Sequence, residues 1–137
     1  MIQRIQTIWL FLIAVLSVLL IFMPVAEKLN FESVSIIPVD LILASESGLI
    51  AVLSVITIFL YKNRPLQIKM CYGIFFLLLL LCATIAYDLW KPIQDTMATV
   101  AYKIPILFPL IAISLDLLAV NSIKRDEKLV RSLDRLR

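Results

Sequence analysis

Four apolar stretches constrain the fold of this chain more than any other feature of its sequence. They cover residues 5–23, 41–60, 70–89 and 104–120, and each is near the ~20 residues that an α-helix needs to cross a ~30 Å hydrocarbon layer. Hydrophobic residues make up 62% of the 137 residues, well above the roughly 45–50% apolar share of soluble domains. The sequence therefore predicts an all-α membrane protein, with four transmembrane helices in an antiparallel bundle.

The segments between these stretches divide the chain further. Residues 61–69 form a short basic turn, whereas 24–40 and 90–103 are longer linkers whose conformation the sequence does not predict. We expect residues 1–121 to form the transmembrane domain. Residues 122–137 contain no glycine or proline, and we expect them to form a separate, basic, amphipathic helix.

The placement of lysine and arginine predicts the orientation. Positive residues concentrate in short cytoplasmic loops of membrane proteins. Three of the 13 lysines and arginines fall in the two longer linkers, and ten fall at the two ends of the chain and in the basic turn. These ten are Arg4, Lys62, Arg64, Lys69, Lys124, Arg125, Lys128, Arg131, Arg135 and Arg137. We therefore expect a multi-pass protein of the bacterial inner membrane, with both termini in the cytoplasm.

The composition argues against enzymatic chemistry. The chain has two glycines and no histidine, so it lacks a glycine loop for phosphates and the commonest acid–base group and metal ligand. Cys71 and Cys82 lie about 16 Å apart along one helix, too far for a disulfide. We expect no catalytic residue, metal or cofactor, and we identify no small-molecule substrate or nucleic-acid partner.

Small residues mark the helix faces that are expected to pack, because helices in lipid associate through close contact. On the first stretch Gln3, Thr7, Ala14 and Ser17 share a face. On the second, small residues again share one, namely Ala44, Ser47, Gly48, Ala51 and Ser54. We expect the two faces to meet.

Asp116 is the sharpest single feature, because an unpaired carboxylate inside a membrane is costly. It shares a helix face with Pro109 and other small residues, and Pro109 predicts a kink because it cannot donate a helical hydrogen bond. One interpretation is an ion- or proton-coupled site. The other is a carboxyl group that keeps its proton or pairs with a basic group such as Arg4. Transport sites need several convergent polar groups, and the sequence offers one here.

The C-terminal tail is the main candidate contact surface. Leu129, Leu133 and Leu136 recur at i, i+4 and i+7, so they form one narrow apolar face flanked by arginines. Such a face docks on anionic lipid headgroups or on a protein. A solvated basic anchor that only sets the topology is the simpler interpretation. The candidate contacts are Arg4, Lys62, Arg64, Lys124, Arg125, Lys128, Leu129, Arg131, Leu133, Arg135, Leu136 and Arg137.

Three segments together resemble a known family. They are MIQRIQT (1–7), LYKNR (60–64) followed by Gln67, and DEKLVRS (126–132) followed by DRLR at 134–137. This pattern is similar to domain of unknown function 4293, a Bacteroidota family of small four-helix membrane proteins. The resemblance spans residues 1–137 and implies the fold but no activity. Since all three segments are expected on the cytoplasmic side, they either bind a partner there or hold the helix ends together.

Two functions remain open from the sequence. The favoured one is a non-enzymatic structural or accessory subunit of a membrane complex, in contact with membrane lipids and with another membrane protein or a second copy of itself. The alternative is a small transporter or channel-like protein in which Asp116 binds an ion or proton.

The predicted topology can be measured directly. Reporter fusions or cysteine accessibility at residues 62–69 and at Arg131 should report the cytoplasm, because positive residues concentrate there. The same probes at Glu32 and Asp95 should report the opposite side. An outward-facing 61–69 turn, or an odd number of crossings, would contradict the prediction.

Overall fold

The computed structural model describes residues 3–23, 26–29, 34–36, 41–94, 99–102 and 104–134. Four long helices dominate it: α1 (Gln3–Phe22), α2 (Leu41–Phe59), α3 (Arg64–Gln94) and α4 (Phe108–Asp134). Two 3₁₀ turns, η1 (Leu60–Lys62) and η2 (Ile104–Leu107), precede α3 and α4. All four helices carry segments long and apolar enough to cross a membrane, so this part of the prediction is confirmed.

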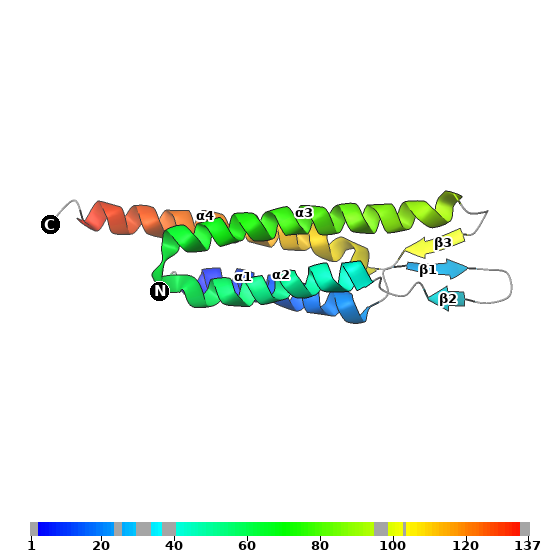
Figure 1. Ribbon diagram of the computed structural model, residues 1–137. Helices are drawn as coiled ribbons and strands as arrows, with labels where there is room; N and C mark the ends of the chain where they lie inside the picture. Colours follow the sequence, from blue (N-terminus) through cyan, green and yellow to red (C-terminus); the bar gives the residue numbers. More distant parts are fainter. Residues whose placement is uncertain are drawn as a thin grey trace.

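The four helices lie side by side (Figure 1). α1 packs against α2 and α4, and α3 packs against the same two helices. The start of α1, the α2–α3 turn and the end of α4 lie at one end of the helices, which we call the termini end (Figure 1). The three short strands lie at the opposite end, which we call the sheet end.

Each helix turns a periodic stripe inward. On α3 the buried residues recur every three or four positions: Gln67, Cys71, Ile74, Leu78, Leu81 and Ile85. Large apolar side chains such as Phe11 and Phe76 are exposed on the outside, at 58% and 67%. A helix that is apolar all round is typical of a membrane span, because lipid covers its outer face.

The predicted small-residue faces agree with the structure in part. Ala14 and Ser17 on α1 are buried, and so are three residues of α2, namely Ser47, Ala51 and Ser54; these helices do pack together. Thr7 is exposed instead, because the neighbouring Gln6 takes the inward position.

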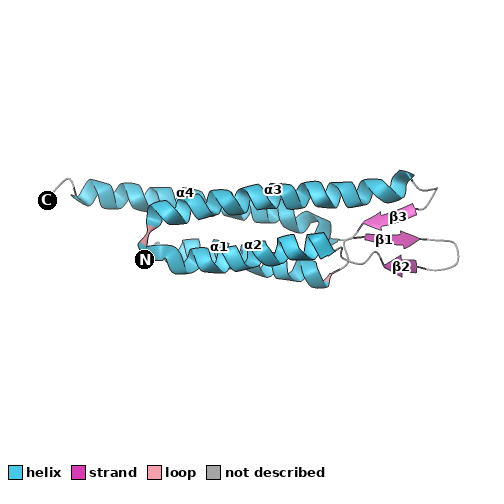
Figure 2. Ribbon diagram, in the orientation of Figure 1, coloured by secondary structure: helices cyan, strands magenta, loops and turns pink. Residues whose placement is uncertain are grey.

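A small sheet joins the two longer linkers, although the prediction included no strand. β1 (Ala26–Leu29) pairs antiparallel with β2 (Val34–Ile36) and with β3 (Thr99–Tyr102). β1 therefore lies in the middle and brings together segments that are far apart in sequence (Figure 2). The β-branched and aromatic residues of β2 and β3 favour strands, and pairing satisfies backbone groups where the chain leaves the helices.

The predicted separate tail helix is wrong. α4 runs without interruption from Phe108 to Asp134, so residues 122–134 extend it. Nothing in this segment breaks a helix, since it contains neither glycine nor proline. Likewise α3 begins at Arg64, so the basic turn is shorter than expected.

The predicted kink at Pro109 is also wrong. Pro109 is the second residue of α4, and η2 ends directly before the helix. The first N–H groups of a helix have no partner within it, so proline is tolerated there without bending the chain. Pro109 therefore lies in the first turn of α4.

This position of Pro109 has a measurable consequence. Pro109→Ala should change the free energy of unfolding by less than about 1 kcal/mol, because no helical hydrogen bond is gained. Ala112→Pro, one turn further into α4, should cost about 3 kcal/mol or more. Thermal unfolding in detergent measures both. Equal effects of the two substitutions on the free energy of unfolding would contradict a start of α4 at Phe108.

Candidate functional site

Polar side chains are buried together at the termini end. Gln6 of α1, Gln67 of α3 and Asp126 of α4 have exposed fractions of 6%, 4% and 6%. A buried polar group needs a partner inside the protein, because hydrocarbon offers none. The contacts of these three residues supply the partners.

Asp126 joins three helices. The Nε2 of Gln6 on α1 donates a hydrogen bond to its Oδ2. The Nη1 of Arg64, the first residue of α3, donates to its backbone carbonyl over 3.1 Å. A carbonyl oxygen has two lone pairs, so this bond is compatible with the helical one. α1, α3 and α4 are thereby linked at one level.

Gln67 links the remaining helix. Its Nε2 donates to the carbonyl of Thr57 on α2 over 3.2 Å. The local turn positions it, because the backbone N–H of Gln67 bonds the carbonyl of Asn63 at 2.9 Å and so closes the first turn of α3. Pro65 falls within that turn, where its missing N–H has no consequence. We call Gln6, Arg64, Gln67 and Asp126 the helix-end network.

An exposed pair lies on the outer side of the network. The Nζ of Lys124 on α4 donates to the hydroxyl of Tyr72 on α3 over 2.7 Å. Lys124 is exposed and Tyr72 is 50% exposed. Arg125 and Lys128 are exposed nearby on α4. This surface can bind an anionic group, because its cations face solvent or headgroups.

The structure brings some of the sequence-predicted contact residues together. Arg64 belongs to the helix-end network, Lys124 pairs with Tyr72, and Leu129 is 53% exposed. The backbone alone is described for four others, Arg4, Lys62, Arg131 and Leu133. Arg135, Leu136 and Arg137 lie outside the described residues.

Asp116 points into the middle of the bundle. It is fully buried, and neither carboxylate oxygen has a hydrogen-bond partner among the residues that the structure describes. The thiol of Cys71 on α3 lies within electrostatic reach of it. Asp116 is not part of the helix-end network. It lies ten residues before Asp126, which is about 15 Å away along α4.

The hydroxyl groups that the structure describes as buried in the bundle are already hydrogen-bonded. Ser17, Ser47, Ser54 and Thr57 each donate to the carbonyl four residues earlier, over 2.9, 2.7, 2.8 and 2.7 Å. Nearer the sheet end, the hydroxyl of Thr84 lies 3.0 Å from a carboxylate oxygen of Glu46. This bond joins α2 to α3, and it gives a partner to an acid that lies within a candidate span.

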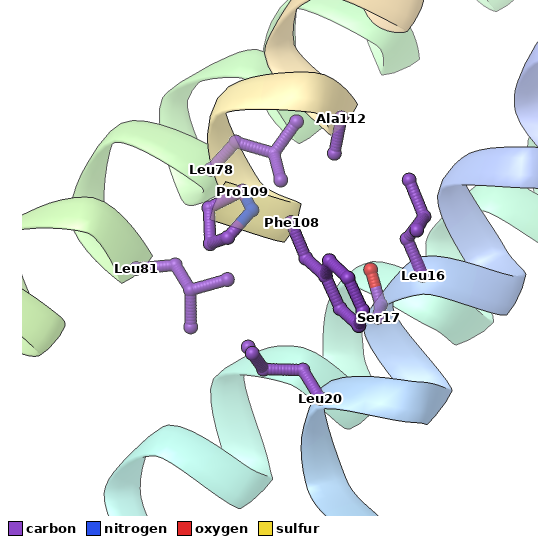
Figure 3. Close-up of a pocket in the computed structure, with 8 residues that line it drawn as sticks. All are labelled: Leu16, Ser17, Leu20, Leu78, Leu81, Phe108, Pro109 and Ala112. Atoms are coloured by element: carbon purple, nitrogen blue, oxygen red, sulfur yellow. The ribbon is translucent and has the colours of Figure 1, made fainter. Parts of the chain in front are cut away.

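The hollows of the bundle are apolar. One, of about 170 Å³, lies between α1, α3 and α4 and is too narrow to admit water. Figure 3 shows the ring of Phe108 beside Ser17 and Leu20, with Pro109 and Leu81 on the other side. A second is wider, with about 180 Å³ that water can enter, and it is lined by Cys82, Ile85, Ala86, Ile106, Pro109 and Leu110. Neither gathers groups that could carry out chemistry, and no three metal-binding side chains meet within the described part of the chain.

One comparison with known proteins is informative. The family described as Domain of unknown function (DUF4293) matches residues 2–136. The chain belongs to this family. No curated protein and no solved structure matches the chain. The resemblance seen in the sequence is confirmed, and each of its three segments contributes to the helix-end network: Gln6 from the first, Arg64 and Gln67 from the second, and Asp126 from the third.

Gln6, Gln67 and Asp126 are absent from the site residues predicted from the sequence. A signal was present, since each continues the buried stripe of its helix: Gln6 precedes Leu10 and Ile13 at helical spacing, and Gln67 precedes Cys71 and Ile74. A polar residue on an otherwise apolar, inward stripe predicts a hydrogen bond between helices. Their partners could not be read from one sequence.

The helix-end network can be tested by removing its centre. Asp126→Ala should lower the free energy of unfolding by about 1–3 kcal/mol, because it leaves the buried amide of Gln6 without its acceptor. Thermal unfolding in detergent can be followed with a thiol-reactive fluorophore, since Cys71 is fully buried. Cys82 is first replaced by alanine, because it is partly exposed.

Lys128→Ala is the matched control, on the same helix but exposed. It should change stability by less than about 0.5 kcal/mol. If Asp126→Ala is as mild as this control, the network does not hold the helix ends together.

Proposed function

We propose that this protein is a non-enzymatic integral membrane protein that serves as a structural or accessory subunit of a membrane complex. Its helices would form an antiparallel transmembrane bundle in the inner membrane of a bacterium. The termini end would face the cytoplasm and would contact lipid headgroups and a partner protein. Four apolar helices of membrane-spanning length support the membrane location.

Charge supports this orientation. The described cations of α3 and α4 that lie outside the longer linkers are found at the termini end, including Arg64, Lys69, Lys124, Arg125 and Lys128. Such residues remain on the cytoplasmic side of a bacterial membrane. At the membrane surface each contributes about 1 kcal/mol of attraction to anionic headgroups. The Lys124–Tyr72 pair is the best-positioned headgroup contact, because it is exposed and joins α3 to α4.

The single observation that carries the partner proposal is the extension of α4. Arg64 begins α3 and bonds the carbonyl of Asp126, so residues 127–134 continue past the start of α3, by about 12 Å. Leu129 and Val130 are 53% and 41% exposed on this extension. Apolar side chains suit lipid inside the membrane, but outside it they favour contact with another protein.

Docking flat on the inner leaflet is less compatible with this geometry. Because α4 is one unbroken helix, its extension would leave the membrane along the axis of the span. The leucine face would then rise away from the lipid surface. A protein partner or a second copy of this chain is therefore the better occupant of that face.

A transporter is the weaker candidate. Asp116 is the one feature that favours it, and the buried hydroxyls among the described residues are bonded to their own helices. Transport of an ion needs several groups that converge on it. An accessory role needs only the surfaces described above.

Site-specific photo-cross-linking at Leu129 tests the partner proposal in native membranes. We expect a discrete cross-linked product with one protein or with a second copy of the chain, because this exposed side chain lies past the start of α3, where we propose that α4 leaves the membrane. Leu118 is the matched control: it is 46% exposed on the same helix but lies eleven residues earlier, within the bundle. Leu129→Ser should release the partner during purification while leaving the bundle folded.

Two results would contradict the proposal. One is equal, diffuse cross-linking from Leu129 and Leu118. The other is rapid proteolysis of the 127–134 segment in native membranes, since a bound helix is protected. Either result would leave the extension as a topology anchor alone.

A further inference from the structure

The buried carboxyl group of Asp116 has no role in the function proposed above. It is fully buried in α4, and both of its oxygens lack a hydrogen-bond partner among the described residues. Asp126, the other buried acid of this helix, has Gln6 as its partner. Both acids lie on the inward face of α4, but Asp126 has a hydrogen-bond donor beside it and Asp116 has none among the described residues.

Among the described side chains around Asp116, little could neutralise a negative charge. α3 faces the interior with Gln67, Cys71 and Ile74, of which Cys71 alone titrates. The buried residues of α1 include no charged group, and neither do those of α2: Gln6, Leu10, Ile13, Ala14, Ser17 and Leu20 on the first, and Leu43, Ser47, Ile50, Ala51, Ser54 and Thr57 on the second. A carboxylate here would be both unpaired and next to a thiol that cannot offset its charge.

Hydration does not solve this problem. The hollow between α1, α3 and α4 is apolar and too narrow for water, and Ala112, one turn from Asp116, lines it. An ionised carboxylate requires water, a cation or several hydrogen-bond donors. A neutral carboxylic acid requires far less, because it carries no net charge.

We propose that Asp116 is a proton-binding site in the centre of the bundle, occupied by a proton whenever the four helices are packed together. Release of the proton requires the helices to separate enough to admit water or a cation. Proton binding and bundle packing are therefore linked: ionisation at high pH favours the open state, and protonation favours the closed one. The bond that breaks on release is the carboxyl O–H, and water or hydroxide accepts the proton.

Infrared spectroscopy of the full-length protein in lipid or mild detergent tests this directly. It distinguishes a protonated carboxyl group from a carboxylate without requiring a reagent to enter the bundle. At neutral pH we expect a band from a protonated carboxyl that Asp116→Asn removes. The band should also disappear at alkaline pH, together with a fall in thermal stability that the Asn variant does not show.

Matched controls separate the neighbouring groups and possible cations. Cys71→Ala should keep the band, because the thiol is not its source. Adding sodium or potassium chloride at neutral pH should leave it unchanged. If the Asn variant does not assemble, Asp116→Leu takes its place as the control. Either uncharged side chain should be able to replace a neutral carboxylic acid in the folded bundle.

Three outcomes would overturn the proposal. In the first, no protonated-carboxyl band at neutral pH can be attributed to Asp116. The residue would then be ionised and paired with a group outside the described side chains, such as Arg4. Loss of the band on adding sodium or potassium would make the site a cation site. Failure of both the Asn and Leu variants to fold would show that the charge itself is required.

Discussion

Inside a hydrocarbon layer a polar side chain can bond only with other protein groups, and this constraint governs the interior of the bundle. Each buried hydroxyl in the described helices satisfies it within its own helix: Ser17 bonds Ile13, and Ser54 bonds Ile50. Such bonds bury a polar atom but hold no helix to its neighbour. Packing of small residues, such as Ala51 beside these serines, therefore carries the association along most of the length of α1 and α2.

The termini end satisfies the same constraint differently. Gln6, Arg64 and Gln67 reach across to other helices, so their hydrogen bonds fix which helix end lies beside which. Because such bonds need matched positions on two helices, they specify register more than they add stability. The family segments contain these residues, which gives a structural reason for the end motifs: they set the alignment of the four helices.

The sequence predicted the helices because membrane spans depend on the local length and apolarity of one segment. It did not predict the sheet, because pairing of β1 with β3 joins residues about seventy positions apart. Pro109 was misjudged for a related reason, since proline bends a helix in its interior but starts one at its first turn, and the start of α4 was unknown. For the candidate site, spacing predicted that Asp116 faces the other helices, and it is buried in the bundle, but the partners of Gln6 and Gln67 depend on tertiary contacts.

The unbroken course of α4 connects the two regions for which we propose a role, the buried site at Asp116 and the extension beyond the start of α3. Along its buried face it carries Asp116 in the bundle and Asp126 in the helix-end network, and it then continues as the exposed extension that bears Leu129. A rigid helix transmits a tilt from one end to the other. A partner that pulls the extension aside would therefore strain the bonds of Asp126 first and loosen the packing around Asp116 next. In the other direction, the opening that we propose for ionisation of Asp116 would shift the angle at which the extension is presented to a partner.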